Sequence, residues 1–186
     1  STDDQEISEI ALSYGAEIPF IRPKSLSDDH TKTSDVISHA LQFEESEGNH
    51  YEYACCIYPT APFLKEDSLK IGLKMIKKGI YDFVFSATTY AFPVQRGFSF
   101  NPQDGLKMLF PQYKEARSQD LKEIFHDAGQ FYWGQSRAWL DDLPIFSNHS
   151  LPIILPREEV TDIDTEEDFK EAELKFKLLQ SPDLRG

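Results

Sequence analysis

The sequence predicts an α/β fold in which a mostly parallel sheet is flanked by helices. Short apolar runs alternate along the chain with longer segments in which apolar residues recur at helical spacing. The runs at 53–58 and 82–88 are nearly continuous, as expected for strands that are buried on both faces. Alternating strand and helix patterns of this kind are typical of parallel sheets.

Length and composition indicate one folded domain. The 186 residues are enough for a sizeable core, and 40% apolar with 13% aromatic residues argues for a folded chain. We therefore take residues 1–186 as a single domain. The net charge of -13 argues against a nucleic-acid-binding surface, which needs a basic patch.

Cysteine usage and hydropathy bear on location. The sequence contains no apolar stretch near the length of a membrane span and no signal-peptide pattern. Cys55 and Cys56 are neighbours in an apolar run, where their side chains point to opposite faces, so a disulfide between them is unfavourable. They indicate small buried side chains in a reducing compartment. We expect a cytoplasmic protein.

The chain opens with a helix pattern. Ser1 or Thr2 followed by acidic residues is typical of a helix start, and Gly15 is placed to end the helix. The apolar residues that share one helical face are Ile7, Ile10, Ala11 and Tyr14. Because an α/β domain rarely begins with a helix and no preceding strand, we expect a further N-terminal segment before this helix.

The following segments alternate between strands and helices. Residues 17–21 predict a short strand, and residues 34–45 predict a helix. A second strand is predicted over 53–58, a helix with a basic last turn over 65–78, and another strand over 82–88.

The middle of the chain breaks this alternation. Aromatic residues with Pro, Gly and Asn breaks over 90–111 predict a hairpin, and residues 130–133 predict a return to the sheet. We expect segment 90–150 to contain an excursion that covers a site or contacts a partner. Its aromatic residues either form an exposed interface stripe or lie in the core, and they are Phe92, Phe98, Phe100 and Phe110.

The segment VTDIDTEEDF contains the main candidate site. In an extended segment Asp162 and Asp164 point the same way, while Ile163 points towards a core. Thr165 and Asp168 have the spacing of a capping box that opens the final helix. A strand that ends in two carboxylates can hold Mg²⁺, which also binds substrate phosphates. Alternatively, the acids only cap the helix and complement its dipole.

Two arginines follow predicted strands or lie in polar loops. Ligands of open α/β sheets bind at the carboxyl ends of strands. Arg22 is placed there to pair with a phosphate or carboxylate, or else to form a surface salt bridge. Arg117, in a polar loop with Gln119, is a stronger candidate.

The order of these motifs resembles a known family. The opening STDDQEISEIA, the segments IRPKSLSDD, IYPTAPF, RSQDL and QFYWG, and the turn TDIDTEEDF resemble the sugar-acid cytidylyltransferases, the CMP-sialic acid synthetase family. The resemblance covers nearly the whole chain. The forms IYPTAPF and DAGQFYWG look most like the pseudaminic acid cytidylyltransferases, which act on a bacterial nine-carbon sugar acid that decorates flagellin and surface polysaccharides.

This resemblance implies a Rossmann-like nucleotidyltransferase with a protruding dimerisation element. The reaction would convert CTP and pseudaminic acid to CMP-pseudaminic acid and pyrophosphate in a homodimer. Asp162 and Asp164 would be the catalytic residues and would hold Mg²⁺ as the cofactor. The resemblance implies that the substrates are bound by Pro59, Thr60, Ala61, Arg117, Gln119 and Tyr132. Arg22, from its position after a predicted strand, is a further substrate-binding candidate.

The sequence also departs from the family pattern. The family's N-terminal basic, glycine-rich loop, which cradles the triphosphate, has no counterpart here, so we expect it to be truncated or unrecorded. A catalytically incompetent fragment of such an enzyme is therefore an alternative. Asp127 stands where sialic acid synthetases carry Asn, which favours a different sugar, although CMP-sialic or legionaminic acid synthesis stays an alternative. A calcium-binding module is a further alternative, but the central Gly and final Glu of a calcium loop are missing.

Overall fold

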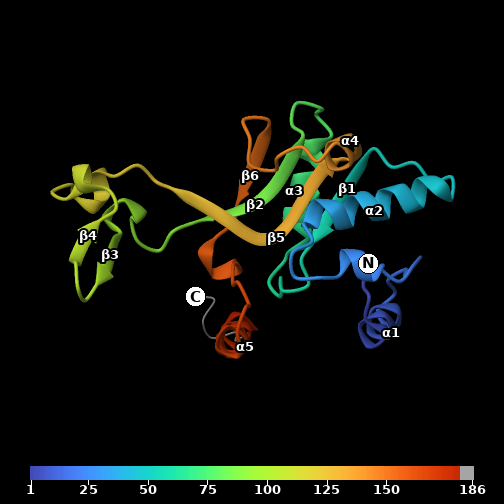
Figure 1. Ribbon diagram of the computed structural model, residues 1–186, viewed down its shortest axis with the longest axis horizontal. Helices are drawn as coiled ribbons and strands as arrows, with labels where there is room; N and C mark the ends of the chain where they lie inside the picture. Colours follow the sequence, from blue (N-terminus) through green and yellow to red (C-terminus); the bar gives the residue numbers. More distant parts are fainter. Residues whose placement is uncertain (181–186) are drawn as a thin grey trace. The chain divides into compact units, whose positions relative to one another are not determined.

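The computed structural model describes residues 1–180, and these include a four-stranded sheet and a separate hairpin (Figure 1). The sheet has the order β1-β5-β2-β6. Its strands are β1 (Tyr53–Ile57), β2 (Phe83–Thr89), β5 (Phe125–Gln135) and β6 (Ser150–Ile154). The strands expected at 53–58 and 82–88 are confirmed, and the return expected at 130–133 lies inside β5.

The central strand β5 runs against its neighbours. Its end lies beside the beginnings of β1 and β2, its middle lies beside the end of β1, and its beginning lies beside the end of β2. In contrast, β2 and β6 run in the same direction. The hydrogen bonds that fix these directions join Ser136 N to Glu52 O (2.9 Å), Tyr58 N to Gln130 O (3.0 Å), Gln135 N to Asp82 O (3.0 Å), Tyr90 N to Ile124 O (3.5 Å), Asp82 N to His149 O (2.8 Å) and Leu155 N to Ala87 O (2.8 Å). The α/β prediction is confirmed, with three strands sharing one direction and β5 reversed.

The chain divides into two compact units. Unit 1 contains residues 1–56, 75–83 and 133–150, and unit 2 contains residues 57–74, 84–132 and the chain from 151 onward. The helices are α1 (Gln5–Ser13), α2 (Thr33–Ser46), α3 (Glu66–Ile76), α4 (Ser136–Leu140) and α5 (Glu166–Gln180). The 3-10 helices are η1 (Lys24–Leu26), η2 (Val94–Arg96), η3 (Pro111–Tyr113), η4 (Ser118–Asp120) and η5 (Arg157–Glu159). No helix among residues 1–180 is long and apolar enough to cross a membrane.

The core of unit 1 forms around Trp139 on α4. Its indole meets Phe83 edge to face with ring centroids 4.9 Å apart, and both side chains are fully buried. Gly134 leaves room for the indole, because a Cβ at this position would lie 2.3 Å from Trp139 Nε1. Ser38 of α2 donates to the Trp139 carbonyl at 2.6 Å, which ties α2 to α4. The core thus depends on a glycine for its closest contact.

The N-terminal segment differs in part from the expectation. Helix α1 forms, with Asp4 accepting from Ile7 N at 2.9 Å as its N-cap and Gly15 in the left-handed conformation (φ 88°) after it. The strand expected at 17–21 is wrong, because the structure has no strand over these residues. Pro19 interrupts that run and cannot donate a ladder hydrogen bond.

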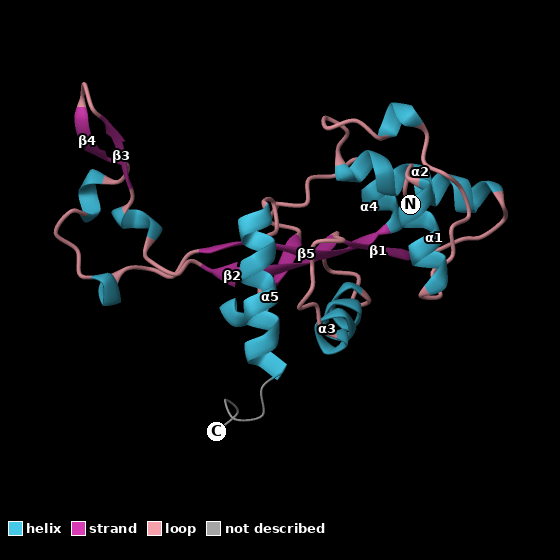
Figure 2. Ribbon diagram, turned by 90° about the horizontal axis from the view of Figure 1, so that it is seen from below, coloured by secondary structure: helices cyan, strands magenta, loops and turns pink. Residues whose placement is uncertain are grey.

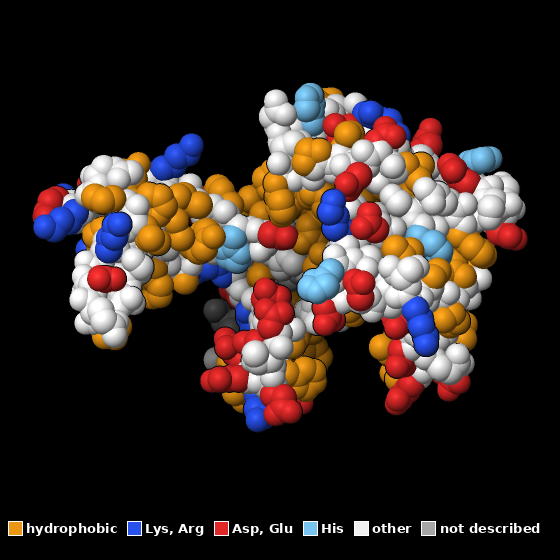
Figure 3. All heavy atoms as spheres, in the orientation of Figure 1, with side chains coloured by type: hydrophobic (Ala, Val, Ile, Leu, Met, Phe, Trp, Pro, Cys, Tyr) orange, Lys and Arg blue, Asp and Glu red, His pale blue; other side chains and the backbone are white. Residues whose placement is uncertain are grey.

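A two-stranded hairpin within unit 2 confirms the hairpin expected at 90–111. Strands β3 (Phe98–Asn101) and β4 (Gly105–Met108) pair antiparallel, and Asn101 Oδ1 accepts from Gln103 N at 2.9 Å in the turn. Figure 2 shows short helical turns beside this hairpin. Apolar side chains gather over the segment in Figure 3. Three of its aromatic residues are more than half exposed, which favours the exposed stripe over the core; they are Phe92, Phe98 and Phe100.

Candidate active site

The site begins with a hydrogen-bonded turn inside β5. The hydroxyl of Tyr132 donates to Asp127 Oδ2, and Gly129 N donates to Asp127 Oδ1 at 3.0 Å. Gly129 adopts a φ of 61°, which only glycine takes without strain, so the strand can fold its backbone around the Asp127 carboxylate. Only 3% of Tyr132 is exposed. Burial first, and then the hydrogen bond to Asp127, raises the pKa of the Tyr132 phenol, which therefore stays a neutral donor.

Aromatic contacts connect Tyr132 to the end of β1. The Tyr132 ring lies 5.2 Å from the Tyr58 ring and is stacked 6.4 Å from Phe85. Tyr58 leads directly into the loop Pro59, Thr60 and Ala61, and Leu64 N closes this loop on Ala61 O at 3.2 Å. Pro59 is exposed, while Thr60 and Ala61 are half-buried. The predicted loop and Tyr132 therefore lie in one region of unit 2, at the carboxyl end of β1.

Asp162 lies against the same turn of β5. A Cβ placed on Gly129 would be 3.9 Å from Asp162 Oδ1. Asp162 and Asp164 are exposed, and Ile163 between them is half-buried, as expected for an extended segment. The strand expected to end at these carboxylates is wrong, because the residues before them form the 3-10 helix η5 and an irregular stretch.

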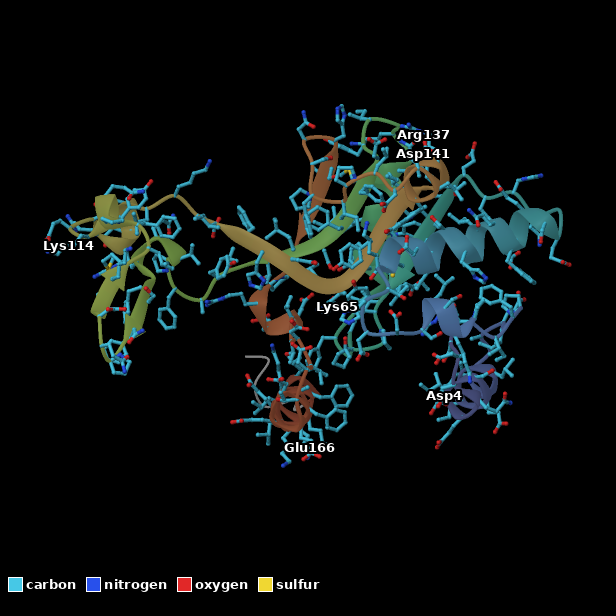
Figure 4. All side chains as sticks on the ribbon, viewed as in Figure 1. Asp4, Lys65, Lys114, Arg137, Asp141 and Glu166 are labelled. Carbon is cyan, nitrogen blue, oxygen red and sulfur yellow. The ribbon has the colours of Figure 1, made fainter. Side chains whose placement is uncertain are left out.

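The irregular stretch is held by side chains from other elements. Gln130 of β5, which is 2% exposed, donates from Nε2 to Glu159 O at 2.5 Å. The Glu159 carboxylate pairs with Lys65 at 2.6 Å. Lys65, which is labelled in Figure 4, stands directly before α3. Backbone groups that form no sheet hydrogen bonds need other partners. Here Gln130 bonds the Glu159 carbonyl, and Lys65 pairs with the Glu159 side chain.

Lys175 of α5 supplies a further set of contacts. Its ammonium reaches Arg157 O at 3.2 Å, Val160 O at 2.7 Å and Thr161 Oγ1 at 3.0 Å. It also lies 5.4 Å from the centroid of the buried Phe63 ring. Burial lowers the pKa of Lys175.

The capping box expected at the start of α5 is confirmed. Asp168 N donates to Thr165 Oγ1 at 3.2 Å, and Thr165 N donates back to Asp168 Oδ2 at 2.8 Å. Asp164 N also reaches Asp168 Oδ2, at 3.2 Å. The side-chain hydrogen bond from Thr165, with the backbone ones, lowers the pKa of Asp168. Asp168 is therefore engaged in capping, as is typical of the first turn of a helix.

The two remaining carboxylates suit a divalent cation. No group of three or more His, Cys, Asp or Glu side chains within residues 1–180 is arranged to hold a metal ion. Asp162 and Asp164 are exposed hard oxygen donors, and Asp162 lies beside Gly129 of β5. Mg²⁺ is commonly bound by one or two carboxylates together with waters and substrate phosphates, so this pair fits it.

Arg117 and Gln119 lie on the hairpin side of unit 2. The Arg117 side chain is 73% exposed and lies 4.0 Å from the carboxylate of Asp120. The Gln119 amide lies 3.1 Å from Arg117 Nε and, with its oxygen turned to the guanidinium, accepts from it. No contact described for residues 1–180 joins Arg117 to Tyr132 or Asp162.

Arg22 belongs to unit 1 and has partners of its own. Its guanidinium pairs with Asp3 at 3.0 Å and donates to Ser27 Oγ at 3.2 Å. Its backbone N donates to Thr2 O at 2.8 Å. Of the two roles expected for Arg22, the structure shows the salt bridge.

Several residues of the site were not predicted from the sequence. Gln130, Lys175 and the partnership between Asp127 and Tyr132 depend on contacts between distant segments. One signal was available for the turn in β5, because Gly129 stands directly before the strand predicted over 130–133. An isolated glycine in a strand often marks a bulge or a close approach.

Comparisons with known proteins find a matching family and similar sequences. The sequence profile of the cytidylyltransferase family matches residues 1–174. The pseudaminic acid cytidylyltransferase of Campylobacter jejuni subsp. jejuni serotype O:2 is 42% identical over 178 residues, which cover 96% of this chain and 77% of that protein. The N-acylneuraminate cytidylyltransferase of Escherichia coli O18:K1:H7 is 27% identical over 171 residues, covering 91% of this chain and 39% of that protein.

A solved structure shares the fold. The CMP:2-keto-3-deoxy-manno-octonic acid synthetase complexed with CTP superimposes with a TM-score of 0.59, over 96% of this chain and 78% of that one. Its sequence is 10% identical, so the likeness concerns the fold alone.

Proposed function

Because the chain belongs to the cytidylyltransferase family, we propose that it converts CTP and pseudaminic acid to CMP-pseudaminic acid and pyrophosphate. It is a nucleotidyltransferase. The observation that supports the choice of sugar is the 42% identity to a pseudaminic acid cytidylyltransferase over 96% of the chain, against 27% for an N-acylneuraminate enzyme. The product would be used to glycosylate bacterial flagellin or surface polysaccharides.

In the proposed reaction the anomeric hydroxyl oxygen of the sugar forms a bond to the α-phosphorus of CTP. The bond from that phosphorus to the α–β bridging oxygen breaks, pyrophosphate leaves with this oxygen, and the hydroxyl proton passes to solvent. Asp162 and Asp164 would hold Mg²⁺, which when bound neutralises phosphate charge and helps to lower the pKa of the attacking hydroxyl. Their exposure, and the position of Asp162 beside Gly129, support this role.

The other candidates divide between the two substrates. Pro59, Thr60 and Ala61 would line the nucleotide and sugar at the end of β1, and Tyr132 would line the sugar pocket as a neutral donor. Arg117 suits the sugar carboxylate, because a guanidinium binds a carboxylate with two parallel hydrogen bonds, and Gln119 would hold it in place. Arg22 would reach an anion only by leaving Asp3.

The proposal extends to assembly and location. The exposed side chains of Phe92, Phe98 and Phe100 support a homodimer in which segment 90–150 contributes to the contact. Cys55 and Cys56 are not joined in a disulfide in the part of the chain that the structure describes, which agrees with a cytoplasmic location. Burial raises the pKa of Cys56 to about 11, so this thiol is unreactive at neutral pH. We expect no interaction with nucleic acid or membranes.

The decisive experiment measures pyrophosphate release from CTP and Mg²⁺ with pseudaminic acid, N,N'-diacetyllegionaminic acid or N-acetylneuraminic acid. We expect release with pseudaminic acid and at least about tenfold lower kcat/KM with the others, which corresponds to about 1.4 kcal/mol of discrimination. A higher kcat/KM with one of the other two sugars would instead assign the chain to CMP-sialic or CMP-legionaminic acid synthesis. Absence of release with all three would contradict catalysis by this chain.

A further inference from the structure

The segment that carries the two candidate metal ligands has no strand to hold it in place. Between the end of β6 and Asp162, residues 155–161 contain η5 and irregular backbone. Backbone hydrogen bonds of the sheet reach as far as Leu155, whose N donates to Ala87 O at 2.8 Å. The placement of Asp162 therefore depends on side chains that reach this segment from elsewhere in unit 2.

Lys175 contacts the two residues that come directly before Asp162 in this segment. Its ammonium bonds Val160 O at 2.7 Å and Thr161 Oγ1 at 3.0 Å, immediately before Asp162. It also reaches Arg157 O at 3.2 Å, so one side chain spans the whole of η5. Three acceptors match the three donors of an ammonium group.

The same side chain also meets the loop at the end of β1. Lys175 Nζ lies 5.4 Å from the ring centroid of Phe63, which is 7% exposed and belongs to the IYPTAPF segment. Helix α5, the segment before Asp162 and the end of this loop thus meet at one half-buried cation. Burial makes each of these hydrogen bonds stronger than it would be at the surface.

We infer that Lys175 is a positioning residue, which holds the segment 157–161 so that Asp162 stays beside Gly129 of β5 and Asp164 follows it in the same extended segment. The inference rests on the proposed metal role of these two aspartates. Lys175 touches neither substrate nor metal in this scheme and acts through the backbone that precedes Asp162.

The sign of one measurement separates this role from simple electrostatics. Replacing Lys175 by Met keeps an unbranched side chain that still packs on Phe63, but it removes a positive charge near Asp162. If Lys175 acted only through its charge, Lys175→Met would strengthen cation binding. If it positions the segment, Lys175→Met weakens cation binding although the local charge becomes more favourable.

The experiment compares Lys175→Met, Lys175→Arg and a matched control, Lys170→Met, which removes the same charge from an exposed position on α5. Hydrogen–deuterium exchange of the unliganded full chain is measured first. In Lys175→Met we expect peptides that cover 157–164 to exchange at least about tenfold faster, with the other peptides unchanged. Lys175→Arg should also loosen the segment, because a planar guanidinium does not match the three acceptors. Lys170→Met should match the wild type.

The second measurement is the Mg²⁺ concentration that gives half-maximal pyrophosphate release at saturating CTP and pseudaminic acid. We expect at least about a fivefold increase in Lys175→Met and none in Lys170→Met. Unchanged exchange, a lower Mg²⁺ requirement, or faster exchange with an unchanged Mg²⁺ requirement would each overturn the inference. An inactive wild type would contradict the proposed function instead, while the exchange measurement would still report whether Lys175 holds the segment.

Discussion

Removing one hydroxyl, in Tyr132→Phe, tests the turn that shapes the candidate site. The hydroxyl donates to Asp127 Oδ2, and the variant removes this bond while the Asp127 carboxylate keeps the hydrogen bond from Gly129 N. The phenyl ring keeps the contacts with Tyr58 and Phe85. The substitution therefore leaves no ring-sized cavity.

The expected loss of stability follows from the burial of Tyr132, whose partner Asp127 is half-buried. A hydrogen bond to a charged group contributes about 1.5–3 kcal/mol, and the 3% exposure of Tyr132 means that water does not readily replace the donor. We expect Tyr132→Phe to lower the free energy of unfolding by about 2 kcal/mol near pH 7. For a chain of this size that lowers Tm by roughly 4–8 °C.

The effect also depends on pH. The pKa of Tyr132 is raised above that of an unfolded tyrosine, so the folded state favours the neutral phenol. The resulting stabilisation is fully present below the ordinary pKa of about 10 and is lost as the pH rises through the folded value. At pH 11, one unit above the ordinary pKa, the wild type should have lost about 1.4 kcal/mol of its advantage over Tyr132→Phe.

Urea denaturation of both proteins at pH 7, 9 and 11 measures this difference, with Tyr14→Phe as the control because Tyr14 is 89% exposed. The control should match the wild type at each pH. A Tyr132→Phe variant as stable as the wild type at pH 7, or a difference that grows from pH 9 to pH 11, would refute the assigned donor and its buried state.

Five further substitutions test other parts of the chain. Asp162→Asn and Asp164→Asn should each lower kcat by at least about a hundredfold with an unchanged Tm, because both side chains are exposed; near-normal pyrophosphate release would remove their metal role. Arg117→Ala should raise KM for the sugar acid by about tenfold or more and leave KM for CTP within about twofold, whereas equal effects in steady-state assays would contradict a sugar-side role. Asp168→Asn should destabilise the protein at neutral pH. Because the pKa of Asp168 is lowered in the folded state, the difference in stability should be present above about pH 4 and fade as the pH falls below it. Denaturation between pH 3 and 7 measures this difference. Gly134→Ala should destabilise by about 1–3 kcal/mol or more, since its Cβ would stand 2.3 Å from Trp139 Nε1, and an unchanged unfolding midpoint would contradict that packing.

Features that depend on near neighbours in the sequence could be predicted from the residues. The capping box of Thr165 and Asp168 joins positions three apart, and the hairpin depends on Asn101 and Gly105 within one turn. The alternation of apolar runs identified the α/β class because burial imposes a period of two or 3.6 residues on any such chain. The strand predicted over 17–21 was wrong for a local reason as well. Pro19 cannot donate a ladder hydrogen bond, although the residues around it are apolar.

The sequence by itself thus determined the fold class, the order of most elements and the exposure of Asp162 and Asp164 on either side of Ile163. Only the tertiary structure decided the reversed direction of β5, the closeness of Asp162 to Gly129, and the partners of Tyr132 and Lys175. These features join segments far apart in the chain, and several chain paths satisfy the same pattern of apolar and polar residues. Which carboxylate a buried hydroxyl meets, and which carbonyl groups a lysine binds, follows from packing the whole chain at once.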